Sequence, residues 1–148
     1  MEIVWHIKTF EALTVNELYA LLKLRSEVFV VEQNCVYLDI DGKDPLALHL
    51  FGEFENQIVA YTRLFKPGIS YDSASIGRVV VASDYRNKKW GKDLMLQSIL
   101  AIENHFGVAQ ITISAQLYLK KFYELLGFVQ SSEMYLEDDI PHIKMIRG

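Results

Sequence analysis

The spacing of apolar and polar residues divides the chain into strand-like and helix-like segments. Loose alternation predicts a first strand over residues 3–8. Apolar positions at helical spacing then predict an amphipathic helix over residues 15–31, and Thr14 followed by Glu17 has the form of a capping box at its start. The same spacing returns over residues 90–106, and the glycine that follows is expected to cap that second helix.

Shorter apolar runs predict the remaining strands and one more helix. The strands are expected at residues 46–54, 57–65, 74–82, 108–114, 128–130 and 142–146, and the helix at residues 117–126. Hairpins mixed with crossover helices predict an α/β (α+β) domain, with a mixed, mostly antiparallel central sheet and helices on both faces. The chain shows no internal repeat and no interdomain linker, so residues 1–148 are expected to form a single domain.

Residues 32–45 interrupt the periodic pattern. Three Asp, one Gly and one Pro predict a loop, yet this loop also carries Val36, Tyr37, Leu38 and Ile40. Apolar residues on an otherwise polar loop indicate that it folds back over another part of the protein. Loops of this length in a compact domain are often functional.

Composition narrows the class of protein. Apolar residues make up 51% of the 148 residues and charged residues 23%, which supplies a core and argues against disorder. The formal net charge of −4 offers no basic surface for nucleic acid. No run approaches the roughly 20 apolar residues of a membrane span, and no signal-peptide pattern opens the chain, so no membrane partner is expected.

The cysteine and histidine content argues against disulfide and metal sites. Cys35 is the single cysteine, which excludes an internal disulfide and a cysteine-rich zinc site and favours a cytoplasmic protein. The four histidines (His6, His49, His105 and His142) show no metal-ligand spacing, so no metal is expected.

The segment with the most chemical information is residues 78–92, in which a buried strand leads through a short polar loop into a helix. The first turn of a helix presents unpaired N–H groups and the positive end of its dipole, which together bind phosphate. Arg86, Lys88, Lys89 and Lys92 add positive charge there, and Gly91 would allow close approach of a ligand. The alternative is a solvated basic turn. Neither a Walker A loop nor a Rossmann glycine pattern is present, which weakens nucleotide-hydrolase and dehydrogenase interpretations.

The loop sequence resembles the signature of the GCN5-related N-acetyltransferase (GNAT) family, Arg/Gln-x-x-Gly-x-Gly/Ala. Here it reads Arg86-Asn87-Lys88-Lys89-Trp90-Gly91, so Lys89 replaces the middle glycine. Phe122-Tyr123-Glu124-Leu125-Leu126-Gly127-Phe128 is similar to a second family element, Phe-Tyr-x-x-x-Gly-Phe. Residues 24–35, 39–44 and 135–143, together with His49, resemble the ElaA-like branch of the family, so the resemblance covers nearly the whole chain.

The resemblance implies a GNAT fold and direct transfer of an acetyl group from acetyl-CoA to a primary amine of a small molecule or peptide. It implies that Tyr123 protonates the leaving thiolate, for which a group with a pKa near 10 is suited. The residues expected to bind the coenzyme are Val79, Val80, Val81, Arg86, Asn87, Lys88, Lys89, Trp90, Gly91, Lys92, Gln116, Phe122 and Tyr123.

The general base and the acceptor site are less well defined by the sequence. His142, Glu32 and His49 are the candidate bases, in that order. The residues expected to contact the acceptor are Glu32, Asp41, His49, Arg63 and Arg78. A covalent acetyl-cysteine at Cys35 is a minor alternative.

Two further functions stay open at the level of sequence. The first is a non-catalytic acyl-CoA-binding module with the same fold, and the second is a protein-interaction module that uses residues 36–40 as its contact patch. The oligomeric state expected is a monomer or a homodimer.

Overall fold

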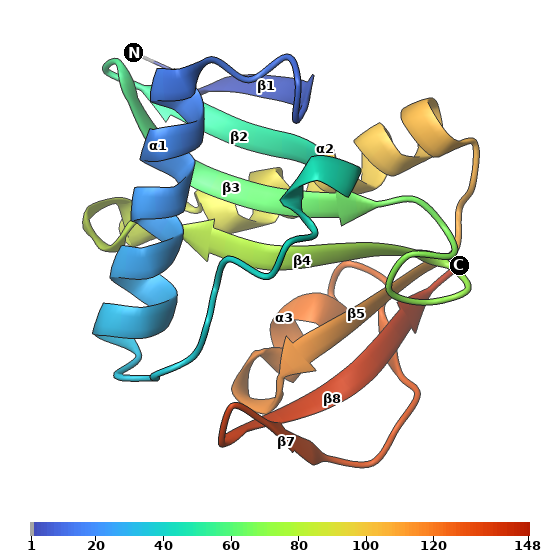
Figure 1. Cartoon of the computed structure of the whole chain (residues 1–148). Coiled ribbons are helices and arrows are strands. Elements are labelled where there is room, and N and C mark those ends of the chain that lie inside the picture. The colour runs from blue at the N-terminus through green and yellow to red at the C-terminus, as the bar shows by residue number, and fades with distance from the viewer. Residues whose placement is uncertain (1) are drawn as a thin grey trace.

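The computed structural model describes residues 2–148, which form one eight-stranded sheet with helices packed against it (Figure 1). The strands are β1 (Val4–Thr9), β2 (Leu48–Phe54), β3 (Gln57–Phe65), β4 (Ala74–Val81), β5 (Ile111–Gln116), β6 (Val129–Gln130), β7 (Tyr135–Glu137) and β8 (Ile140–Arg147). Their order is β1-β2-β3-β4-β5-β8-β6, and β7 pairs with β8. Pairing is antiparallel except between β4 and β5. The predicted mixed, mostly antiparallel sheet is confirmed.

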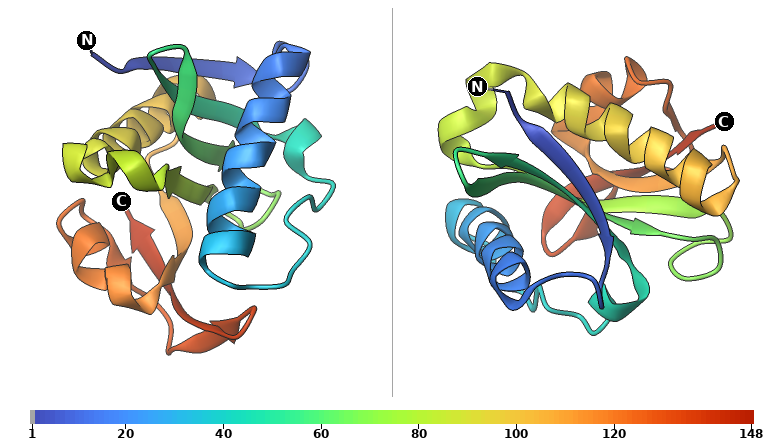
Figure 2. Two further views of the ribbon diagram at one scale, coloured as in Figure 1. Left: turned by 90° about the vertical axis from the view of Figure 1, so that its left-hand side faces the viewer. Right: turned by 90° about the horizontal axis from the view of Figure 1, so that it is seen from above.

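Helices cover both faces of the sheet, as predicted (Figure 2). The helical segments are α1 (Val15–Arg25), η1 (Ser26–Glu32), η2 (Asp44–Leu46), η3 (Ser83–Lys88), α2 (Trp90–Phe106), η4 (Leu117–Leu119) and α3 (Lys120–Glu124). Adjacent residues of a strand point to opposite faces. Leu50 of β2 therefore packs in the core beneath α2, whereas Phe51 packs with Leu21 and Leu24 of α1.

The ends of several elements differ from the predicted ones. The capping box at Thr14 is confirmed, but the α-helix ends at Arg25 and continues as the π-helical segment η1, in which the N–H of Gln33 bonds the carbonyl of Val28. Apolar residues continue through η1, so the pattern gave no sign of the change in winding. The helix predicted over residues 117–126 is a 3₁₀ turn followed by five α-helical residues. Strand β7 was missed by the sequence analysis.

The sheet opens between β4 and β5. Within residues 2–148, these parallel strands pair only at Ala74 with Ile111 and at Ser75 with Thr112, and they diverge beyond that point (Figure 1). A bulge in β4 falls in the same region, where the β3–β4 register shifts and Arg78 adopts a left-handed φ of 51°. The side of β4 from Gly77 onward therefore faces an opening instead of a neighbouring strand.

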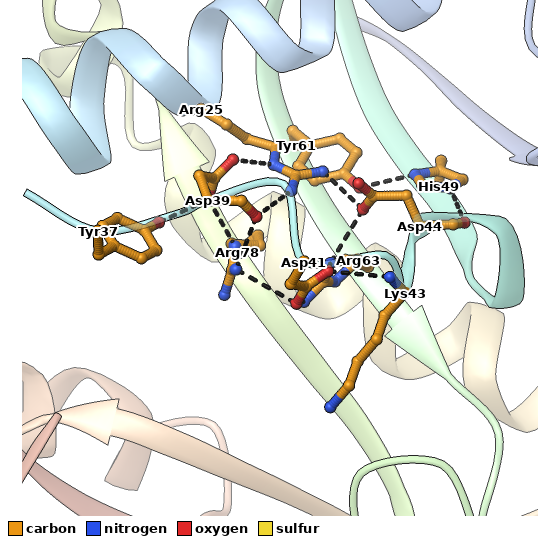
Figure 3. Close-up of polar contacts among 10 residues, drawn as sticks. All are labelled: Arg25, Tyr37, Asp39, Asp41, Lys43, Asp44, His49, Tyr61, Arg63 and Arg78. Atoms are coloured by element: carbon orange, nitrogen blue, oxygen red, sulfur yellow. Dashed lines mark hydrogen bonds and ion pairs between the residues drawn. The ribbon is translucent and has the colours of Figure 1, made fainter. Parts of the chain in front are cut away.

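The loop of residues 33–43 is fixed to the sheet by a buried ion-pair network (Figure 3). Arg25 is fully buried, and its Nε and Nη1 lie 2.8 Å from Asp39 Oδ2 and 2.8 Å from Asp44 Oδ1. Arg63 donates from both terminal nitrogens to Asp41, at 2.8 Å each, and from Nη1 to Asp44 at 2.9 Å. Paired and hydrogen-bonded charges can be buried, whereas a charge left alone there is very unfavourable.

Arg78 joins this network from the bulge of β4. Its Nε lies 2.7 Å from Asp39 Oδ1, and its Nη2 donates to the Asp39 carbonyl at 3.0 Å. The Arg78 guanidinium also lies over the ring of Tyr37, whose hydroxyl donates to Asp39 at 2.5 Å. Three arginines and three aspartates thus balance in charge and hold the loop against the open side of the sheet.

Replacement of Arg25 by Met is expected to lower the free energy of unfolding by about 3–5 kcal/mol, because the buried carboxylates of Asp39 and Asp44 each lose one of their two arginine partners. Urea denaturation would measure the change. Lys23→Met is the control, since Lys23 is exposed on the same helix and its ion pair with Glu27 contributes at most about 1 kcal/mol. Equal losses in the two variants would contradict a structural role for the network.

The network also makes stability depend on pH. Burial alone would raise the pKa of Asp41, but Arg63, the Lys43 amide and Arg78 hold that pKa well below its usual range. A lowered folded-state pKa stabilises the protein above the unfolded-state value of about 3.9, and this contribution is lost as the pH falls below it. Asp41→Asn should therefore be less stable than the wild type at pH 7, with a difference that shrinks toward pH 2.5 in urea titrations. A difference independent of pH would contradict this assignment.

Candidate active site

A cleft of about 470 Å³ occupies the opening between β4 and β5. One wall is formed by η1 and the start of the 33–43 loop, and the other by β5, the turn after it and the β7–β8 hairpin. The cleft brings together nine residues predicted as site residues: Glu32, Arg78, Val79, Val80, Val81, Arg86, Gln116, Tyr123 and His142. These residues come from distant parts of the sequence, and the opening of the sheet collects them.

The predicted phosphate loop lies at one end of this cleft, where η3 leads into α2. Lys89, which replaces the glycine of the family signature, has a left-handed φ of 60°. This is a conformation that glycine adopts more easily than lysine, so Lys89 occupies a position where glycine would be less strained. A Cβ on Gly91 would meet only the tip of the Phe122 ring, at 3.9 Å, so the start of α2 is open to a ligand.

Seven predicted coenzyme or loop residues do not line the cleft. They are Asn87, Lys88, Lys89, Trp90, Gly91, Lys92 and Phe122. The prediction that the Trp90 side chain binds the coenzyme is wrong. Its indole is buried, with its ring 5.0 Å from that of Phe54 and 5.7 Å from that of Tyr85, so only its backbone could contact a ligand.

Arg86 is held in the cleft by Glu32. The Glu32 carboxylate accepts two hydrogen bonds from the Arg86 guanidinium, one of them at 2.9 Å to Nη2, and Arg86 Nε donates to the Val81 carbonyl at 3.1 Å. The hydrogen bond from Arg86 lowers the pKa of Glu32. A carboxylate tied to a guanidinium in this way is a weaker base than a free one, and the role of Glu32 as a general base stays a prediction.

Tyr123 lines the cleft from α3 and is 5% exposed. Its ring packs edge-on against Phe122 and Phe128, at 5.1 and 6.0 Å. Burial raises the pKa of the Tyr123 hydroxyl, so the group is protonated at neutral pH. It is therefore in the state required of a proton donor.

His142 lies on β8 at the opposite wall and is 6% exposed. Its Nδ1 is 2.7 Å from the carbonyl oxygen of Ile140, and its Nε2 is 3.4 Å from Glu137 Oε2. The ring stacks on Tyr135. This arrangement directs the imidazole edge that carries Nε2 toward the carboxylate of Glu137, which also lines the cleft.

The remaining acceptor candidates separate into two groups. Asp41 and Arg63, with Arg78, line an adjoining hollow of about 530 Å³, and Tyr37 lies on both hollows. His49 is fully buried between the Tyr61 hydroxyl at 2.7 Å and the Asp44 carbonyl at 2.9 Å, and it lines neither hollow. Burial lowers the pKa of His49. The expectation that His49 contacts the acceptor or acts as the base is wrong, because no ligand can reach it.

The cleft is also lined by three residues that were not predicted to belong to the site, namely Tyr37, Ser114 and Glu137. Tyr37 lies in the predicted loop and Glu137 in the segment 135–143 that resembles the family, but nothing in the sequence pattern indicated that the two segments meet. They lie about a hundred residues apart, and the Cys35 thiol donates to the Asp138 carbonyl at 3.4 Å across the cleft.

Two kinds of feature are absent from the part of the chain that the structure describes. Residues 2–148 contain no group of three or more His, Cys, Asp or Glu side chains placed to hold a metal ion. None of the described helices combines the length and the apolar character that a membrane crossing requires.

Comparisons with known proteins agree with the fold and the cleft. A family model described as an acetyltransferase (GNAT) domain matches residues 19–147. Protein ElaA of Escherichia coli is 41% identical over 145 residues, which cover 97% of this chain and 95% of that protein. The crystal structure of E. coli ElaA superposes with a TM-score of 0.90 at 40% identity and covers 98% of this chain and 99% of that one.

A crystal structure of an acyl-CoA N-acyltransferase from Pseudomonas aeruginosa is similar over the full length. It has a TM-score of 0.95 and 43% identity, and it covers 99% of this chain and 100% of that one. The resemblance inferred from the loop at Arg86 and the element at Tyr123 is thereby confirmed. The chain belongs to the GNAT acetyltransferase family, as an ElaA-like protein with an acyltransferase fold.

Proposed function

We propose that this protein transfers an acetyl group from acetyl-CoA to a primary amine by direct attack. The observation that supports this most strongly is the cleft itself, in which a free strand side, an arginine beside a helix N-terminus and a buried tyrosine converge. Bound acetyl-CoA would supply a thioester whose carbonyl carbon an amine can attack, with loss of the sulfur as leaving group.

The residues of the cleft fit such a donor. The main chain of Val79–Val81 has no partner from β5, because β4–β5 pairing stops at Ser75, and it can bond the amides of an extended arm. The N-terminus of α2 and Arg86 can hold a diphosphate, with Lys88, Lys89 and Lys92 adding positive charge nearby. Gln116 lines the same cleft and offers an amide to the arm.

The chemical step can be divided between the two walls. The backbone N–H groups of β4 beside Arg78 polarise the thioester carbonyl. His142 Nε2 takes the first proton from the acceptor nitrogen and passes it to water. Tyr123 gives its hydroxyl proton to the departing sulfur, and the second proton that the nitrogen loses as the amide forms restores the tyrosine.

Charge at Arg86 should decide the affinity for acetyl-CoA. Arg86→Glu is expected to weaken binding at least about tenfold in isothermal titration, because it replaces a charged donor to the diphosphate by a like charge. Glu32→Gln should strengthen binding about two- to fivefold, since the diphosphate no longer competes with a carboxylate for Arg86.

Glu11→Gln is the matched control, because Glu11 is exposed and lies outside the cleft. Failure of the wild type to bind at millimolar acetyl-CoA would refute the proposed donor. Binding without turnover on any amine of a broad panel would favour the non-catalytic module in its place.

Tyr123→Phe should lower kcat about a hundredfold or more and leave the Kd for acetyl-CoA within twofold, because the ring packing is kept and only the proton donor is lost. Steady-state kinetics together with isothermal titration would separate the two constants. A large loss of affinity at unchanged kcat would show that Tyr123 binds the donor and does not protonate sulfur.

A further inference from the structure

Gly77 lies at the bulge of β4, and neither its backbone conformation nor its packing requires a glycine. Among residues 2–148, five of the eight glycines have a positive φ, but Gly77 does not. A Cβ on Gly52 would lie 2.5 Å from Ile3 Cδ1, whereas a Cβ on Gly77 would meet none of the described atoms within 4 Å outside its two chain neighbours. Glycine in a strand lowers stability relative to alanine. Gly77 therefore leaves an open space at a cost in stability.

This open space is on the face of the sheet that carries the 33–43 loop. Ile76 and Val79 both pack in the core beneath α2, so the bulge turns the two positions between them to the other face. Arg78 confirms this direction, because its guanidinium reaches Asp39 of the loop (Figure 3). A side chain at position 77 would therefore project into the hollow that the loop borders.

Gly77 also lies where the cleft meets this adjoining hollow of about 530 Å³. It lines both of them, as do Ile76 on the same strand and Ser114 on β5 across the opening. Two of these three positions thus hold small residues. Beyond Gly77 the hollow extends to Phe65 and Tyr71. A ligand in the cleft can therefore extend past Gly77 without displacing a side chain.

The order of residues along β4 brings the acyl group of the proposed donor to Gly77. In the proposed function, Arg86 holds the diphosphate, the free main chain of Val79–Val81 bonds the extended arm, and the thioester carbonyl lies beside Arg78. An acyl chain continues in the direction of the arm. Its first carbon beyond the carbonyl therefore reaches Gly77, and a longer chain would pass over this residue into the adjoining hollow.

We propose that the protein also transfers acyl groups longer than acetyl, such as propionyl and butyryl, and that Gly77 is the residue that admits them. This inference rests on the proposed function and extends its donor class to short-chain acyl-CoA thioesters. The acceptor nitrogen bonds the butyryl carbonyl carbon, the carbon–sulfur bond breaks, and coenzyme A leaves as a thiol that carries one proton from the nitrogen. A methyl group at position 77 would occupy the space of the added carbons, which is the kind of contact that discriminates between substrates differing in chain length.

Isothermal titration with acetyl-CoA and butyryl-CoA tests the space at Gly77 without requiring turnover. The wild type should bind the two thioesters with Kd values within about threefold of each other. Gly77→Ala should weaken binding of butyryl-CoA at least about tenfold relative to acetyl-CoA. Ala109→Val is the control, because it adds bulk at an exposed residue outside both hollows and should leave the ratio of the two Kd values unchanged.

The outcomes of this titration separate the inference from the proposed function. Binding of acetyl-CoA but not butyryl-CoA to the wild type would overturn the inference alone, as would an equal loss of affinity for both thioesters in Gly77→Ala. Failure of the wild type to bind either thioester would refute the proposed function and the inference with it.

Turnover tests the transfer itself. The acceptor is the amine of a broad panel that the wild type acetylates fastest, and the product is identified by mass spectrometry. The wild type should form the N-butyryl product with a kcat/KM within about tenfold of that for acetyl-CoA, and Gly77→Ala should lower the butyryl-to-acetyl ratio at least about tenfold. An acetylated product without any butyrylated one would overturn the inference.

The melting temperature tests whether the glycine serves folding. Gly77→Ala should leave Tm unchanged or raise it by up to about 4 °C, because alanine restricts the unfolded chain and its methyl group meets open space. A lower Tm in thermal denaturation would show that the fold itself requires the glycine, and would overturn the inference.

Discussion

The interruption of the sheet between β4 and β5 is the constraint on which the rest of the structure depends. Two residue pairs hold these strands together, and everything beyond them is open. An opening in a sheet exposes unpaired main-chain groups, which are costly to bury without a partner. The protein leaves them at a cleft, where a ligand can pair with them, and gathers its polar side chains on the same opening. The cleft therefore begins at the point where hydrogen bonding between β4 and β5 ends.

The two walls of the cleft are built by different physical means. On one side, the 33–43 loop has no regular structure of its own and is fixed by buried arginine–aspartate pairs. On the other side, Glu137 and His142 come from a regular hairpin and are aligned by strand pairing. Each arginine of this network pairs with two aspartates, and each aspartate with two arginines, so the loss of any one member leaves the buried charges unbalanced. Ion pairs therefore fix the wall formed by the 33–43 loop, and hydrogen bonds between strands fix the wall formed by the β7–β8 hairpin.

Much of the fold could be predicted because local pattern and tertiary structure agree over most of the chain. The helix at Trp90–Phe106, the capping box at Thr14 and the mixed sheet all follow from periodicity. The π-helical continuation after Arg25 could not be predicted, because its apolar spacing is compatible with an α-helix. In the site, Arg86 and Tyr123 could be found from short motifs. His49 was assigned to the site because a neutral imidazole can act as a base near neutral pH, but its side chain is buried in the core, and burial depends on contacts between distant residues that the sequence alone does not reveal.

Lys89 occupies the position at which the family signature has its middle glycine. The position is occupied here by a long cationic side chain, yet the backbone still turns with a left-handed φ of 60°. In this chain the position therefore depends on a backbone turn, which lysine can make although glycine makes it with less strain. A substitution of Lys89 is therefore better judged by whether the new residue tolerates a left-handed turn than by whether it keeps the positive charge.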